Sequence, residues 1–178
     1  MDASQTIWPL ALALVFFAGW IDWRTRRLPN WLTVPSLLLG VVVHTWSAGW
    51  HGAVTALEGA GLGLLILLPL VLMRALGAGD WKLMGALGAL LGPHMFLSVL
   101  LASIGVSGLM ALFLMVHAKR VKVTLRNLFS LVQGLLTFGL RVHPEISLDN
   151  TELLKLPFGV AAAGGTLICF LAARWGSL

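Results

Sequence analysis

Apolar residues occur along this chain in long runs with few polar interruptions, and short polar or turn-forming stretches separate them. The longer runs reach the roughly 20 apolar residues that a helix needs to cross a bilayer. Short turns at residues 47–52 and 92–94 divide two pairs of runs. The pattern therefore predicts an all-α polytopic membrane protein with about six transmembrane helices, at Trp8–Ile21, Trp31–Trp46, Ala53–Met73, Trp81–Leu91, Met95–Val116 and Pro157–Ala173.

The composition supports this class. Of 178 residues, 58% are hydrophobic and 11% are charged, whereas a soluble domain carries about 25% charged residues. One bundle of this size uses the whole chain, so we expect a single integral-membrane domain over residues 1–178. Residues 119–141 carry polar side chains every three or four positions, which predicts an amphipathic helix along the inner leaflet. That helix would be a surface anchor or a platform that receives a substrate.

The basic residues predict an orientation. The net charge is +5, and eleven of the twelve Lys and Arg residues fall on one side of the six expected spans. By the positive-inside rule that side is the cytoplasm and both termini are periplasmic. Topology thus explains the positive charge, and no nucleic-acid partner is expected. No basic residue precedes the first run and no cleavage site follows it, so we expect a retained helix and not a signal peptide.

Two acidic residues lie where apolar runs meet this inner side. Asp22 closes the first run and Asp80 opens the fourth. About 14 apolar residues precede Asp22, or roughly 21 Å of helix against a hydrocarbon core of about 30 Å, so we expect that helix to continue past Asp22. Both carboxyl groups would then lie at a similar depth inside the apolar boundary. An ionisable group in that position is a functional-site hypothesis by default.

A pair of carboxylic acids suits the hydrolysis of an amide. Two such groups brought close together share one proton, because both cannot ionise cheaply. The ionised acid can act as general base on a water, and the protonated one as general acid. This chemistry requires neither a metal nor a cofactor, and we expect none. The single Cys169 and the five His residues show no ligand spacing.

The residues around Asp80 form the stretch Gly77-Ala78-Gly79-Asp80-Trp81-Lys82. Glycines at 77 and 79 would let an extended peptide backbone approach the acid closely. Lys82 would either hold Asp80 ionised, bind a substrate carbonyl, or anchor the helix at the interface. Upstream, Pro29 and Asn30 are expected to end one helix and cap the next.

These stretches resemble the motifs of a known family. Asp22-Trp23-Arg24-Thr25-Arg26-Arg27-Leu28-Pro29-Asn30 resembles the first motif of the type IV prepilin peptidases, which are GxGD-type intramembrane aspartyl proteases. Gly77–Lys82 resembles their second motif, Gly-x-Gly-Asp with a Lys two residues on, and Leu156-Pro157-Phe158-Gly159 resembles the start of their last helix. The resemblance implies that Asp22 and Asp80 are the catalytic pair, with Gly77, Gly79 and Lys82 in support.

The same resemblance implies an activity and partners. The chain is similar to bacterial inner-membrane endopeptidases that remove the short basic leader of prepilins at the cytoplasmic face, with the prepilin and the lipid bilayer as partners. The fullest members carry an insert with paired Cys-x-x-Cys motifs and also methylate the new N-terminus. Here that insert is missing, so the chain resembles the short, peptidase-only form of Flp/Tad pilus systems, and N-methyltransferase activity is not expected. Archaeal preflagellin peptidases share the layout, and the substrate and the oligomeric state stay open.

Two other functions are compatible with a helical membrane bundle. A proton-coupled transporter also keeps carboxylates in its helices, but near the midplane with access to both faces. A non-catalytic assembly factor of a pilus or secretion system would not explain two acids matched in depth. The peptidase hypothesis accounts for both features.

Overall fold

The computed structural model describes residues 3–117, 129, 132–133 and 157–176. These residues contain four helices and no strand, which confirms the all-α class: α1 (Ala3–Thr25), α2 (Asn30–Leu72), α3 (Ala78–His117) and α5 (Phe158–Arg174). The amphipathic helix expected at 119–141 lies outside the described residues, except for positions 129, 132 and 133, which are helical.

The expected count of six separate transmembrane helices is not supported. Three helices are long and apolar enough to cross a membrane, with candidate segments at Thr6–Thr25, Asn30–Leu72 and Ala78–His117, and α5 is shorter. The difference arises because the four middle runs merge in pairs into α2 and α3. Both helices nevertheless contain non-helical residues at the expected turns, namely Ala48 and Gly49 in α2 and Gly92 in α3.

The two breaks have a local cause in the sequence. Gly49 has φ 58° and Gly92 has φ 72°, in the left-handed region that glycine adopts at little cost. Pro93 follows the second break. It lacks an N–H and its fixed φ suits the first position of a helix, so it ends one helical segment and begins the next.

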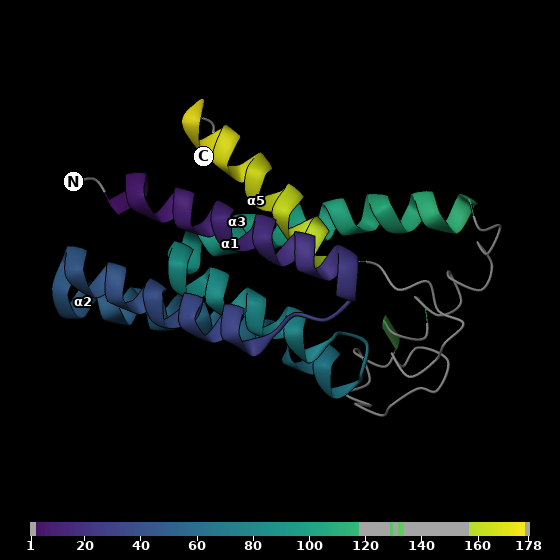
Figure 1. Cartoon of the computed structure of the whole chain (residues 1–178), viewed down its shortest axis with the longest axis horizontal. Coiled ribbons are helices and arrows are strands. Elements are labelled where there is room, and N and C mark those ends of the chain that lie inside the picture. Colours follow the sequence, from purple (N-terminus) through teal and green to yellow (C-terminus); the bar gives the residue numbers. More distant parts are fainter. Residues whose placement is uncertain (1–2, 118–128, 130–131, 134–156, 177–178) are drawn as a thin grey trace.

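The chain doubles back at the break in α2. Gly40 and Gly59 are nineteen positions apart and would be separated by about 28 Å on a straight helix. Yet a Cβ added to either would meet neighbouring residues of α3, Ala89 for Gly40 and Gly88 for Gly59. The two halves of α2 therefore lie side by side against α3, and Figure 1 shows this reversal.

The first half of α3 forms the centre of the core. It packs against α2, while α5 contacts both α3 and α1. Every residue from Leu83 to Gly92 is buried. One close helix contact joins Gly59 and Gly88, where a Cβ on either residue would overlap the carbonyl oxygen of the other. Small residues permit such close packing of helices in membranes, and this contact fixes α3 against α2.

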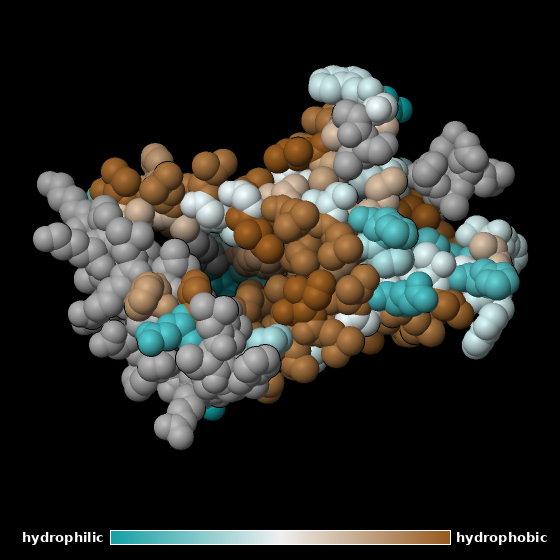
Figure 2. All heavy atoms as spheres, turned by 180° about the vertical axis from the view of Figure 1, so that it is seen from behind, coloured by the Kyte–Doolittle hydropathy of each residue, from teal (hydrophilic) through white to brown (hydrophobic). Residues whose placement is uncertain are grey.

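The outer surface is strongly apolar. Many large hydrophobic side chains are exposed, among them Leu38, Leu65, Leu101 and Phe113. Figure 2 shows apolar side chains gathered across the middle of one face, with more hydrophilic side chains toward one end. In Figure 1 the end of α1 and the link between α2 and α3 lie at the same end of the molecule. The candidate functional site lies at this end.

Candidate functional site

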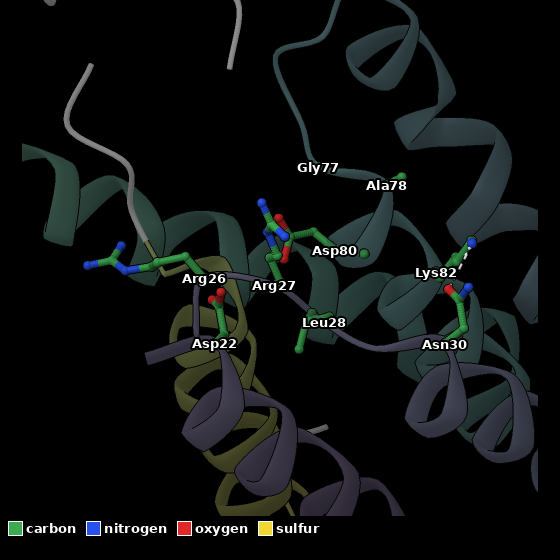
Figure 3. A pocket seen from close by; sticks show the side chains of 10 residues that line it. Asp22, Arg26, Arg27, Leu28, Asn30, Gly77, Ala78, Asp80 and Lys82 are labelled. Carbon is green, nitrogen blue, oxygen red and sulfur yellow. Dashed lines mark hydrogen bonds between the residues drawn. The ribbon is translucent and has the colours of Figure 1, made fainter. Parts of the chain in front are cut away.

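A cavity of about 350 Å³ lies where the end of α1 meets the beginnings of α2 and α3. Figure 3 shows the side chains that line it. All five residues that the sequence singled out belong to this lining, which consists of Asp22, Arg26, Arg27, Leu28, Asn30, Gly77, Ala78, Gly79, Asp80 and Lys82. The structure thus brings Asp22 and Asp80 to one cavity, although 58 positions separate them in the sequence.

Asp22 is held at the end of α1. The helix continues to Thr25, which confirms the expectation that it extends past Asp22. The Asp22 side chain is only 6% exposed. Its Oδ2 accepts a hydrogen bond of 2.9 Å from the backbone N–H of Gly159, in the first turn of α5. The carboxylate is therefore fixed by the helix that follows 137 positions later.

The turn after Asp22 carries two of the basic residues into the cavity lining. The Thr25 hydroxyl donates to the carbonyl of Ile21 at 2.9 Å, which closes the last turn of α1. Arg26 then adopts φ 53°, a conformation that costs a non-glycine residue roughly 1–2 kcal/mol. Its N–H still reaches the carbonyl of Asp22 at 2.9 Å. This reversal places Arg26 and Arg27 beside Asp22, and the Arg26 charge acts on that carboxyl group.

Asp80 lies in the first turn of α3 and is half-buried. A Cβ added to Gly77 would come within 3.1 Å of its Oδ2, so a side chain at position 77 would crowd the carboxylate. Trp81 anchors the same turn, because its indole N–H donates to the carbonyl of Leu64 in α2 at 2.7 Å. Asp80 is thus positioned by glycine on one side and by a bond to α2 on the other.

The space beside the two glycines before Asp80 faces other residues of this protein. Gly77 faces the Asp80 carboxylate. A Cβ at Gly79 would lie 3.0 Å from the Cβ of Leu28 and 3.2 Å from its carbonyl oxygen. The link between α1 and α2 therefore packs directly on Gly79. In this structure the space that the sequence analysis assigned to a substrate backbone at position 79 is occupied by Leu28.

Lys82 has a partner that the sequence analysis did not consider. Its Nζ donates a hydrogen bond of 2.9 Å to Oδ1 of Asn30, the first residue of α2. The expectation that Asn30 caps α2 is wrong, since Pro29 occupies the capping position and makes no side-chain cap bond. The Asn30 side chain instead ties the beginning of α2 to the beginning of α3, at the edge of the cavity.

Three contributors to the site were missed from the sequence: Asn30, Trp81 and Gly159. Asn30 and Trp81 stood inside the quoted motifs, so their proximity to the acids was visible, but their bonding partners were not. Gly159 followed a Pro and a Phe at the expected start of the last helix. Nothing in the linear pattern pairs it with Asp22.

The chemistry that this arrangement offers is acid–base chemistry by two carboxyl groups. The Asp22 charge acts on Asp80, so the two groups are within electrostatic range of each other. Three cationic side chains, Arg26, Arg27 and Lys82, line the same cavity. No group of three or more His, Cys, Asp or Glu residues that could hold a metal ion occurs within the described part of the chain.

Comparison with known proteins identifies the family. The model of the type IV leader peptidase family matches residues 10–115, which is more than half of the chain and includes both Asp22 and Asp80. No curated protein and no solved structure matches. The apolar helices and the family together indicate a membrane-embedded peptidase. The chain belongs to the type IV leader peptidase family.

Proposed function

We propose that this protein is an aspartic endopeptidase that removes the short basic leader of type IV prepilins, with Asp22 and Asp80 as its catalytic pair. The observation that carries the proposal is that both carboxyl groups line one cavity of about 350 Å³. Membership of the leader peptidase family supports the peptidase activity. The aspartic mechanism and the identity of the substrate are our inference.

In this mechanism the ionised member of the pair takes a proton from a water. The water oxygen bonds to the carbonyl carbon of the scissile peptide, while the protonated member donates its proton to the carbonyl oxygen. The carbon–nitrogen bond then breaks, the leaving nitrogen takes up the proton held by the base, and one hydroxyl of the tetrahedral intermediate returns a proton to the other aspartate as the new carboxyl group forms. This is the standard division of work between a general base and a general acid. The pair returns to its original protonation state.

We further propose that the helices form six crossings within one integral-membrane domain. The reversal of α2 at Gly49 and the break of α3 at Gly92 support this arrangement. The half of α2 before its break would reach about 27 Å, close to the roughly 30 Å of a hydrocarbon core. The distribution of the basic residues supports a cavity on the cytoplasmic side of the bacterial inner membrane, with both termini in the periplasm.

The substrate would be an Flp-like prepilin, whose leader lies at the cytoplasmic face and whose apolar helix lies in the bilayer. Gly77, Gly79 and Lys82 would act in support. Gly77 lacks a side chain that would crowd the Asp80 carboxylate, and Gly79 allows Leu28 to pack closely against it. Lys82 donates a hydrogen bond to Asn30. The chain shows no paired Cys-x-x-Cys motifs, and we expect it to leave the new N-terminus unmethylated.

The test is to co-express a candidate prepilin with wild-type protein and with Asp22→Asn and Asp80→Asn separately. Each change should abolish leader removal, measured by the N-terminal sequence of the pilin, while the protein stays in the membrane. Glu58→Gln is the matched control, because Glu58 is an exposed acid of α2 outside the cavity lining. Cleavage that persists in either aspartate variant would rule out the pair.

A further inference from the structure

We infer that Gly159 is a positioning residue for catalysis, and that the first turn of α5 holds Asp22 as the base of the pair. This inference rests on the proposed function, because it presupposes that Asp22 reacts with a water. It assigns a role to a helix that carries no acidic side chain of its own in the described residues and that lies beyond the segment matched by the family.

The contact is made by backbone atoms of α5. The N–H of Gly159 reaches Oδ2 of Asp22 at 2.9 Å, and the contact is buried. The first N–H groups of a helix have no partner within the helix. Pro157 occupies the capping position of α5 without a side-chain cap bond. Asp22 therefore supplies from α1 the acceptor that a capping side chain would otherwise supply.

The approach is possible only because both helices have glycine at the contact. A Cβ on Gly159 would lie 3.0 Å from the Cβ of Asp22 and 3.2 Å from its Oδ2. On the opposite side, a Cβ on Gly19 would lie 3.2 Å from the carbonyl oxygen of Gly159. Gly19 precedes Asp22 by three residues and so shares its face of α1. A methyl group at either position would crowd the contact between α1 and α5 and require its neighbours to shift by a few tenths of an ångström.

Burial favours the neutral form of Asp22, and the bond from Gly159 opposes that effect by favouring the carboxylate form. A hydrogen bond donated to a carboxylate favours its charged form, and the positive end of a helix dipole acts in the same direction. The other charged groups facing the cavity are Arg26, which acts on Asp22, then Arg27, Lys82 and Asp80. Within the described residues, no side chain or backbone group donates a hydrogen bond to the Asp80 carboxyl group. Asp22 is thus the acceptor of the water proton, and Asp80 is the acid.

The experiment uses the full-length protein purified in detergent and a prepilin substrate. Gly159→Ala and Gly19→Ala enter the contact from opposite helices. Gly164→Ala is the control, because it adds the same methyl group to α5 but meets only the side chain of Val106 in α3, at 3.3 Å, and no atom of α1 within 4 Å. Rates are expressed per folded molecule, with the folded amount measured by size-exclusion chromatography.

We expect Gly159→Ala and Gly19→Ala to lower kcat by about tenfold or more, the effect of weakening one hydrogen bond to a charged group. KM should stay within about twofold, since ground-state binding does not use this bond. The acidic limb of the pH–rate profile should move to higher pH, because the base has lost a donor that favours its charged form. Gly164→Ala should retain the wild-type kcat and pH profile.

Three results would overturn the inference. The first is a folded Gly159→Ala or Gly19→Ala with the wild-type kcat and acidic limb. The second is a change in KM without a change in kcat. The third is an equal decrease of kcat in Gly164→Ala, which would reflect the general packing of α5. If one contact variant does not fold, the other still decides the matter. Failure of the proposed function would look different, because either the wild type would not remove the leader or Asp22→Asn would remain active.

Discussion

The contact between Gly40 and α3 gives the most direct test of how the helices are held together. A Cβ added to Gly40 would lie 2.7 Å from the carbonyl carbon of Ala89 and 2.8 Å from the nitrogen of Leu90. Carbon atoms in ordinary contact are about 3.5–4.0 Å apart. The neighbours are backbone atoms of a buried helix, so they cannot rotate away. Gly40→Ala must therefore move the first half of α2 by about 1 Å.

The cost of this change can be compared with that of a harmless one. Overpacking a well-packed core typically costs about 1–3 kcal/mol. Gly61→Ala is the matched control, since it lies in the second half of α2 and a Cβ there meets nothing within 4 Å. Replacing an unconstrained helix glycine by alanine gains up to about 1 kcal/mol. The two substitutions are chemically identical and should have effects of opposite sign.

Thermal unfolding of the purified protein in detergent, followed by circular dichroism, measures the difference. At about 2–4 °C per kcal/mol for a protein of this size, Gly40→Ala should lower Tm by about 2–12 °C. Gly61→Ala should leave Tm unchanged or raise it by up to about 4 °C. Equal midpoints for the two variants would refute the close approach of α2 to α3 at this point.

Three further predictions follow from the site. Lys82→Met and Asn30→Ala should each lower leader removal by less than about tenfold, because each removes the same hydrogen bond of 2.9 Å. For the same reason the double variant should be no less active than the less active single variant. Fully additive losses would contradict the pairing. Arg26→Gly should have a Tm about 2–8 °C above that of Arg26→Ala, because both lack the guanidinium but only glycine is unstrained at φ 53°; an equal Tm would contradict this reasoning. Leader removal by the purified protein should persist in a chelator such as EDTA, because a carboxyl pair needs no metal, and activity that is lost with EDTA and restored by zinc would argue for a metal.

The parts of the fold that follow from composition and length were predictable from the sequence. The long apolar runs indicated an all-helical membrane protein, and the glycine and proline residues indicated the breaks at 47–52 and 92–94. The shortness of the first run also required α1 to extend past Asp22. The expected number of separate helices did not hold, because helical hydrogen bonding resumes immediately after Gly49 and after Gly92. When each apolar run is counted as one helix, such breaks are counted as loops between helices.

The membership of the cavity was predictable to a similar degree, and its internal contacts were not. The distribution of basic residues predicted that Asp22 and Asp80 lie on the same side of the membrane, and the lengths of the apolar runs predicted similar depths. Both predictions depend only on how far a residue lies from the end of its helix. The bonds of Lys82 to Asn30 and of Gly159 to Asp22 depend on how the helices are rotated about their axes. That rotation is decided by glycine contacts such as the one between Gly59 and Gly88, which require knowing which helices are neighbours.

The link between Asp22 and α5 also bears on when the protein becomes competent during its synthesis. Both acids are synthesised within the first half of the chain, whereas the donor that fixes Asp22 belongs to α5 and is synthesised 137 positions later. A nascent chain that has already inserted its first helices would therefore hold both carboxyl groups without the geometry that we assign to the reaction. If Asp22 and Asp80 act as we propose, the reaction would reach its full rate only after α5 has packed against α1.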